Sequence, residues 1–219
     1  MSDPSRPGAV LFDVEGVLVH PDPDALDRGF ASLWPGLTLD AVDAARASGA
    51  LYPAWERYSI GALDGPAYWR IVLESLGRPV DDARLDALAA VLRTAWWARP
   101  DPAMFALVAE LRASEPGLRL GILSNSCADH DDALAGFADR FDAVCFSHRV
   151  GRRKPDRDAY LGAAEALGVA PEAVLFIDDK GRNTVAAEAA GLHAVRFTGI
   201  DALRRALAAR GLLAGERAA

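Results

Sequence analysis

Short apolar segments alternate with longer amphipathic segments through the second half of this chain, and this alternation limits the folds that the chain can adopt. The apolar segments cover residues 118–123, 142–147, 173–178 and 193–197, and a segment with helical periodicity follows each of them. Strands that alternate with helices form a parallel sheet whose two faces are both covered by helices. Residues 9–18 begin as one more buried strand, which we assign to the same sheet. The sequence therefore predicts an α/β fold.

The chain between the first strand and residue 100 follows a different pattern, in which no strand is evident. It contains four or five amphipathic stretches separated by turn signals, with Asp64 and Asp81 at positions typical of helix N-caps. These stretches predict a block of helices inserted after the first strand. We expect residues 1–19 and 100–219 to form the α/β core and residues 20–99 to form the inserted helical domain.

The composition of the 219-residue chain narrows its class. Apolar residues make up 51% of it, enough for a buried core, and no apolar run approaches the length of about 18–20 residues that a membrane span needs. The net charge is −7, and nucleic acids and anionic membranes repel an acidic chain, so we expect neither partner. The N-terminus lacks a secretory signal pattern and two cysteines exclude a disulfide scaffold, which favours a cytoplasmic location. The sequence indicates no oligomeric state.

Polar residues follow several of the predicted strands. They form four groups: Asp13 with Glu15, Ser124 with Asn125 and Ser126, Lys154 at the end of a basic run, and Asp178 with Asp179. Ligands of such sheets bind at the carboxyl ends of the strands, where we expect the four groups to converge. Residues two apart in an extended strand point to the same side, so Asp13 and Glu15 face one pocket unless the chain turns at Val14.

Four carboxylates at one edge of a sheet repel one another unless a hard cation lies among them. Mg²⁺ suits this position because it binds carboxylate, carbonyl and water oxygens and usually keeps a phosphate ligand. A lysine and a hydroxyl would bind the remaining oxygens of that phosphate. Lys154 and Lys180 are the only lysines among 24 basic residues, and lysine supplies a compact point charge where arginine supplies a planar fork. These residue types indicate a Mg²⁺ site for a phosphorylated ligand.

Each group also has a structural explanation when it is taken alone. An acidic pair after a strand is common in solvated turns, the segment 124–126 is typical of a helix cap, and a basic run is usually a solvated loop. The four groups in this order, on alternating strands, favour a shared site.

The motifs resemble those of a known family. The segments FDVEGVL and ILSNS, the pair Lys154-Pro155, and FIDD followed by Asn183 are similar to the four motifs of the haloacid dehalogenase (HAD) superfamily of hydrolases. The helical insertion resembles the C1 cap of its subfamily I. The combination NS, KPD and DDxxxN looks most like the branch that contains sugar-phosphate phosphatases and the N-terminal phosphatase domain of soluble epoxide hydrolases. This resemblance implies a Rossmann-like three-layer core under a mobile helical lid.

The resemblance also implies a Mg²⁺-dependent phosphatase that acts on a small phosphorylated metabolite. By that pattern, Asp13 attacks phosphorus and forms an aspartyl-phosphate. Glu15 protonates the leaving oxygen and then takes a proton from the attacking water. Ser124, Asn125 and Lys154 bind the phosphoryl oxygens.

The metal site implied by the same resemblance holds one Mg²⁺ ion. Its ligands are Asp13, the backbone carbonyl of Glu15, and Asp179, while Asp178 orients metal-bound water. The sequence leaves open which of the two adjacent aspartates binds the ion directly. The ion would neutralise charge between the nucleophile and the phosphoryl oxygens.

Glu15 departs from the common family pattern, which has Asp two residues after the nucleophile. The enolase-phosphatase branch has a similar Asp-Ile-Glu-Gly-Thr motif, although its other motifs differ from those of this chain. Three other functions stay open. One is a metal-independent haloacid dehalogenase, in which Asp13 attacks carbon, and another is a phosphomutase that uses the same residues. The third is a non-catalytic or weakly active HAD-fold binding protein.

Overall fold

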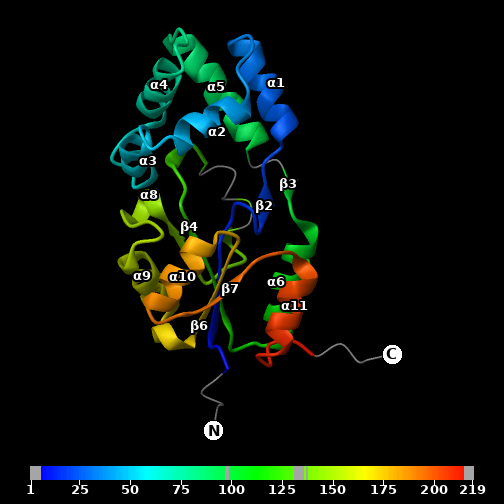
Figure 1. Ribbon diagram of the computed structural model, residues 1–219. Coiled ribbons are helices and arrows are strands. Elements are labelled where there is room, and N and C mark those ends of the chain that lie inside the picture. The colour runs from blue at the N-terminus through cyan, green and yellow to red at the C-terminus, as the bar shows by residue number, and fades with distance from the viewer. Residues whose placement is uncertain (1–5, 97–98, 131–135, 137, 215–219) are drawn as a thin grey trace.

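The computed structural model describes residues 6–96, 99–130, 136 and 138–214. A sheet flanked by helices forms the lower part of the molecule in Figure 1, and a group of helices, α1 to α5, lies above it. Within the described residues, no helix combines the length and the apolar character needed to cross a membrane.

The main sheet contains five strands that are all parallel. They are β1 (Ala9–Phe12), β4 (Arg119–Ser124), β5 (Ala143–Phe146), β6 (Val174–Asp178) and β7 (His193–Arg196), and their spatial order is β5-β4-β1-β6-β7. The structure confirms the predicted α/β fold and its Rossmann-like parallel sheet. The first strand lies at the centre of the sheet, so the residues that follow it stand between the ends of β4 and β6.

Helices cover both faces of this sheet (Figure 1). They are α6 (Pro102–Ser114), α8 (Ser147–Val150), α9 (Arg157–Leu167), α10 (Gly181–Ala189) and α11 (Ile200–Ala208). Short 3₁₀ helices occupy Ala128–His130 and Pro171–Ala173. The predicted helix around 129–138 falls mostly on residues outside the described part of the chain.

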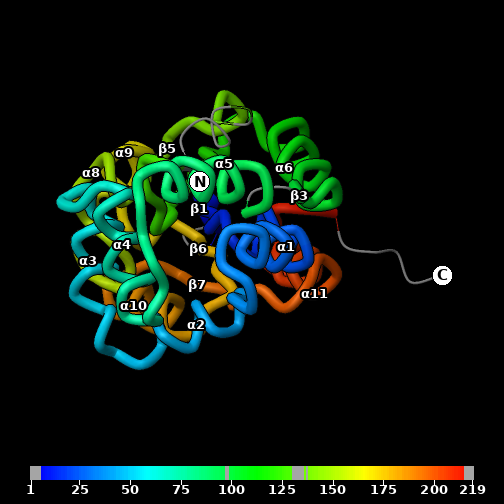
Figure 2. Tube along the Cα trace, turned by 90° about the horizontal axis from the view of Figure 1, so that it is seen from above, coloured from blue at the N-terminus to red at the C-terminus, as the bar shows by residue number. Residues whose placement is uncertain are grey.

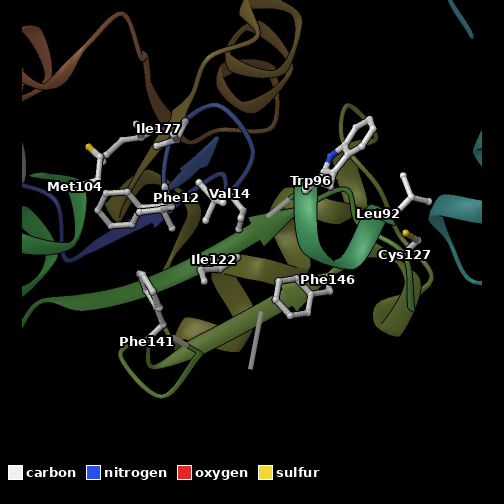
Figure 3. Packing of buried hydrophobic residues seen from close by; sticks show 14 of the residues in the cluster. Phe12, Val14, Leu92, Trp96, Met104, Ile122, Cys127, Phe141, Phe146 and Ile177 are labelled. Carbon is white, nitrogen blue, oxygen red and sulfur yellow. The ribbon is translucent and has the colours of Figure 1, made fainter. Parts of the chain in front are cut away.

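Alternate side chains of β1 reach the two faces of the sheet, as the period of a strand requires. Val10 and Phe12 belong to the larger apolar cluster, together with residues of α6 and α11, whereas Ala9 and Leu11 pack with α9 and α10. Figure 3 shows Phe12 of the larger cluster beside Met104. The same cluster continues into the five upper helices, so one core joins the two parts of the molecule.

The five upper helices, which we call the cap helices, come between β1 and α6. They are α1 (Pro23–Leu33), α2 (Leu39–Ala47), α3 (Tyr52–Ser59), α4 (Gly65–Ser75) and α5 (Asp82–Ala95). Asp64 and Asp81 are the N-cap residues of α4 and α5, as predicted. Their side chains accept hydrogen bonds from backbone N–H groups in the first turns of these helices. Figure 2, seen from above, shows the cap helices over the carboxyl ends of the strands.

A two-stranded antiparallel ribbon joins the cap helices to the core. Val19–His20 (β2) pairs with Arg99–Pro100 (β3), so the two ends of the inserted segment lie side by side. The sequence did not indicate this ribbon, because two residues are too few to show a period and the partners lie far apart along the chain. The predicted domain boundaries fall inside the ribbon, and the division into two domains stays a prediction.

Candidate active site

The predicted site residues meet at the carboxyl edge of the sheet. Phe12 is in register with Ile122 of β4 and with Ile177 of β6, so the residues after these positions lie at one level. A cavity of about 710 Å³ opens there, and five of the predicted residues line it: Asp13, Glu15, Ser124, Asn125 and Lys154. Carboxylate oxygens of Asp178 and Asp179 lie within 4.8 Å of one from Asp13. The structure thus brings all seven residues together.

A buried lysine connects two of the carboxylates. Lys154 Nζ lies 2.8 Å from Asp13 Oδ1 and 2.7 Å from Asp178 Oδ2, and the residue is only 2% exposed. Buried charges cost several kcal/mol unless they are paired and hydrogen-bonded, so this ammonium and its two carboxylates depend on one another. The rarity of lysine in the chain did point to this residue.

The two carboxylates beside Lys154 have different proton affinities. Burial raises the pKa of Asp13 to about 7, although the attraction of Lys154 opposes that rise. Burial alone would also raise the pKa of Asp178, but Lys154 and several hydrogen bonds hold it below its ordinary value. Asp178 is therefore the more acidic of the two carboxyl groups beside the lysine, and Asp13 is the less acidic one.

Asp178 has donors on both of its oxygens. The backbone N–H of Lys180 donates to Oδ1 over 2.8 Å, and Asn183 Nδ2 lies 3.0 Å from Oδ1 and 2.9 Å from Oδ2. Lys154 donates to Oδ2. Asp178 therefore holds the loop after β6 and the lysine in place. Asn183 belongs to the motif that the sequence showed, yet its contact with Asp178 is visible only in the structure.

Asp179 differs from its neighbour because its Oδ1 is buried without a hydrogen-bond partner among the described residues. Burial raises the pKa of this carboxyl, Lys180 lowers it, and the neighbouring carboxylates raise it further. Gly16 makes the approach of Asp179 feasible, since a Cβ on Gly16 would lie 2.9 Å from the Asp179 Cγ, and its φ of +83° also favours glycine. Asp179 therefore has a carboxylate oxygen, close to those of two other acidic residues, that a cation could contact.

The donor set fits Mg²⁺. Asp13, Asp178 and Asp179 offer carboxylate oxygens, the ligands that this hard cation prefers, and one oxygen from each lies within 4.8 Å of the others. The oxygens of Asp178 are already used by nitrogen donors, whereas Asp179 has an oxygen to offer. Asp13 and Asp179 are therefore the carboxylates that suit direct coordination.

Glu15 receives a hydrogen bond from the far end of the cap helices. Trp96 follows α5, and its Nε1 donates to Glu15 Oε2 over 2.9 Å. The chain turns after Asp13, and Glu15 forms a bridge with Val19 of the ribbon, but both acidic residues still line the same cavity. The sequence did not reveal the Trp96 contact, because 81 positions separate the partners.

Asn125 fixes the loop that carries Lys154. Its Nδ2 donates to the Lys154 carbonyl oxygen over 2.7 Å, and its Oδ1 accepts from the Lys154 N–H over 2.8 Å. Two parallel bonds of this kind act as a clamp between the loop after β4 and the lysine. Ser124, at the end of β4, is 1% exposed and lines the cavity beside them.

The buried lysine generates a prediction about stability. Lys154→Met leaves two carboxylates side by side without their cation, so we expect the free energy of unfolding to fall by about 3–5 kcal/mol at pH 8. The loss should shrink toward pH 5, because Asp13, with its pKa of about 7, is then largely protonated and one charge is removed. Urea denaturation followed by circular dichroism at both pH values measures the two differences.

Lys180→Met is the matched control, since Lys180 is the other lysine and its side chain is exposed. It removes the same charge but no buried bridge, so its effect should stay below about 1 kcal/mol. The bridging role of Lys154 would be contradicted if both variants lost the same free energy of unfolding. It would also be contradicted if the loss in Lys154→Met were the same at both pH values.

Known proteins match this chain over most of its length. The haloacid dehalogenase-like hydrolase family matches residues 7–191. A phosphoglycolate phosphatase from Rhodospirillum rubrum is 30% identical over 205 residues, which cover 86% of this chain and 78% of that protein. The phosphatase relative fits the capped phosphatase branch that the motifs resemble.

Two solved structures share the fold. The L-2-haloacid dehalogenase of Xanthobacter autotrophicus with chloropropionic acid covalently bound is 29% identical, with a TM-score of 0.66 over 92% of this chain and 82% of that one. A HAD family enzyme from Bacteroides thetaiotaomicron in complex with magnesium and inorganic phosphate is 19% identical, with a TM-score of 0.65 over 86% and 92% of the chains. The resemblance predicted from the motifs is confirmed, and so is the expectation of an enzyme. This chain belongs to the haloacid dehalogenase-like hydrolases.

Proposed function

We propose that this enzyme is a Mg²⁺-dependent phosphatase that hydrolyses a small phosphorylated metabolite through an aspartyl-phosphate. One observation carries the proposal: Asp13 lies on the wall of the large cavity with Glu15, next to the buried Lys154 and to Asp179, whose Oδ1 has no partner in the described part of the chain. The similarity to a phosphatase that acts on phosphoglycolate supports it.

Asp13 supplies the nucleophile. Its Oδ1 accepts hydrogen bonds from the Val14 N–H and from Lys154, whereas within the described residues no donor is bonded to Oδ2. Oδ2 is therefore the oxygen that attacks phosphorus, and the new O–P bond forms as the bond to the leaving oxygen breaks. A covalent intermediate divides one difficult displacement into two easier ones.

Glu15 transfers the protons. It gives its carboxyl proton to the leaving oxygen and later takes one from the water that attacks the aspartyl-phosphate, so it ends each turnover as it began. Trp96 holds Oε2, which leaves Oε1 for the proton. General acid–base catalysis of this kind contributes about 10²–10⁴-fold.

The phosphoryl group is bound by residues at the end of β4 and in the loop after α8. Ser124 and Lys154 supply a hydroxyl and an ammonium at the cavity wall. The side chain of Asn125 is engaged with the Lys154 backbone, so Asn125 contributes its backbone N–H and the position of the lysine. These donors stabilise the charge that develops on the phosphoryl oxygens.

Asp13, the Glu15 carbonyl and Asp179 would hold the metal, and Asp178 would keep their loop and Lys154 in position. When bound, Mg²⁺ supplies positive charge that neutralises the phosphoryl oxygens facing the nucleophile.

A metal-independent dehalogenase is the second candidate. The structure of the Xanthobacter autotrophicus enzyme, 29% identical, contains a covalently bound chloropropionic acid. The ion pair of Lys154 with Asp13 needs no metal, which is the observation that favours this alternative. Asp179, with an oxygen that lacks a partner, weighs against it.

The first test measures both reactions. We expect turnover of 4-nitrophenyl phosphate and of small alkyl phosphates with Mg²⁺, loss of that activity with EDTA, and no chloride release from 2-chloropropionate. Asp13→Asn should abolish hydrolysis while the circular dichroism spectrum is unchanged, because an amide is not a nucleophile here. Chloride release without metal would establish the dehalogenase instead. Phosphatase activity of Asp13→Asn within about tenfold of the parent would show that Asp13 is not the nucleophile.

The second test separates the two adjacent aspartates. Asp178→Ala removes a residue that acts through Lys154, so it should weaken Mg²⁺ binding by about 10- to 100-fold and lower the melting temperature. Asp179→Ala removes a direct ligand, so it should weaken Mg²⁺ binding further with little thermal cost. Calorimetric titration with Mg²⁺ and thermal unfolding of both variants supply the two readouts. The reverse order of affinities would exchange the two roles.

The third test concerns the bond between Trp96 and Glu15. Trp96→Phe removes the N–H but keeps an aromatic ring, and we expect kcat to fall about tenfold with little change in KM, the usual effect of losing one hydrogen bond to a charged group. Glu15→Asp should also lose activity, since the shorter side chain cannot reach both Trp96 and the leaving oxygen. The double variant Glu15→Asp/Trp96→Phe should then have a kcat close to that of Glu15→Asp alone.

Trp34→Phe is the control for this cycle, because Trp34 is also buried but donates its Nε1 to the Pro79 carbonyl oxygen within the cap helices. It should leave kcat unchanged. Full additivity of Glu15→Asp and Trp96→Phe would show that the two residues act independently.

A further inference from the structure

A second, smaller pocket lies directly beside Glu15, between the core and the cap helices. Its volume is about 30 Å³, room for a group of a few atoms, since one water needs about 10–15 Å³. Glu15 and Asn125 come from the core, and the aromatic side chains of α3, α4 and Trp96 form most of the remaining wall. Four residues line both this pocket and the large cavity, so the two spaces adjoin at the proposed proton donor: Glu15, Arg46, Trp55 and Asn125.

Arg46 of α2 is the one cationic residue that lines this pocket among those described. Its guanidinium carbon lies 4.8 Å from the ring centroid of Trp55 and 5.6 Å from that of Trp96, so aromatic rings hold the group. Its acidic partner among the described residues is Asp43, one turn away at 3.4 Å, whose side chain is 56% exposed. That distance is long for a charged hydrogen bond, and the N–H groups of Arg46 are available for a stronger acceptor.

Two buried donors line the same pocket. Tyr68 Oη and Trp69 Nε1 have no hydrogen-bond partner within the described residues, although the two side chains are 0% and 6% exposed. Burial raises the pKa of Tyr68, with Arg46 opposing the rise, so the hydroxyl stays protonated and remains a donor. A buried donor without an acceptor costs about 1–3 kcal/mol, so this pocket is built for a group that only accepts.

We propose that the small pocket binds a carboxylate on the alcohol portion of the substrate, which makes the substrate a phosphomonoester of a small hydroxy acid. This inference rests on the proposed phosphatase function. A carboxylate is planar, accepts hydrogen bonds on both oxygens and matches the fork of Arg46. A second phosphate is larger and more strongly hydrated than a pocket of about 30 Å³ with aromatic walls can accommodate.

The two spaces place the substrate in a definite order. In this placement the phosphoryl group lies in the large cavity at Asp13, the leaving oxygen at Glu15, and the carboxylate in the small pocket at Arg46, whose side chain borders both spaces. Because Glu15 belongs to both walls, few atoms separate the leaving oxygen from the carboxylate. Short 2-hydroxy acids meet this requirement, whereas sugars do not.

The test compares two esters that differ only in this group, 2-phospholactate and its amide, with Mg²⁺. We expect the parent to prefer the acid by about 100-fold in kcat/KM, the value of a charged hydrogen-bonded contact. Arg46→Gln should remove most of that preference by raising KM for the acid, with less than about threefold effect on the amide. Tyr68→Phe, which deletes only a hydroxyl, should reduce the preference for the acid several-fold. It provides a second test of the pocket if Arg46→Gln does not fold.

Arg57→Gln is the matched control, since Arg57 is exposed on α3 and its loss changes the net charge equally. It should leave the preference intact. Equal turnover of the acid and the amide by the parent would refute the carboxylate site and leave the proposed phosphatase function intact. An equal loss on both esters in Arg46→Gln would assign that residue a structural role.

A binding measurement keeps the two proposals separate. Lactate should quench the tryptophan fluorescence of the metal-free parent, lactamide should not, and Arg46→Gln should weaken lactate binding by at least about tenfold. If no ester is hydrolysed, the phosphatase proposal fails and this titration decides the pocket by itself. Absence of lactate binding together with equal turnover of the two esters would refute the inference.

Discussion

The site depends on one buried cation. Lys154 joins Asp13 of the central strand to Asp178 of its neighbour, and without it two carboxylates would face each other in the interior. Their contact fixes the ends of β1 and β6 and the loop after β5 relative to one another. Because the lysine can be shared between two acids, Asp13 can give up part of that contact to a substrate while Asp178 retains the charge pair.

The chemistry of the core and the selection of substrate meet at Glu15. Trp96, just after the last cap helix, holds its carboxylate, and the ring of Trp96 also lies against Arg46. A glutamate reaches one methylene farther than the aspartate that is common in the family, and its Oε2 accepts the hydrogen bond from Trp96. In the proposed mechanism, this bond would couple the cap helices to the proton-transfer step.

Sequence patterns predicted the sheet well because most of its strands are short apolar runs, and polar residues follow several of them. They also identified all seven residues that converge on the site, since chemistry-bearing residues after parallel strands meet at one edge. They did not reveal the ribbon of β2 and β3, the hydrogen bond of Trp96 to Glu15, or the clamp of Asn125 on Lys154. Those contacts join residues 29 to 81 positions apart and follow from tertiary packing, which leaves no local period.

The overall charge and the charge of the cavity act at different ranges. A net charge of −7 repels a polyanion that covers a wide surface, but at physiological salt the field of distant acidic residues is screened beyond about 8 Å. A small anion in the cavity meets nearby cations instead, with Arg46, Arg153, Lys180 and Arg182 on its walls besides the paired Lys154. A negative net charge is therefore compatible with a cavity that attracts small anions, because short-range charges in a concave site determine which anions bind.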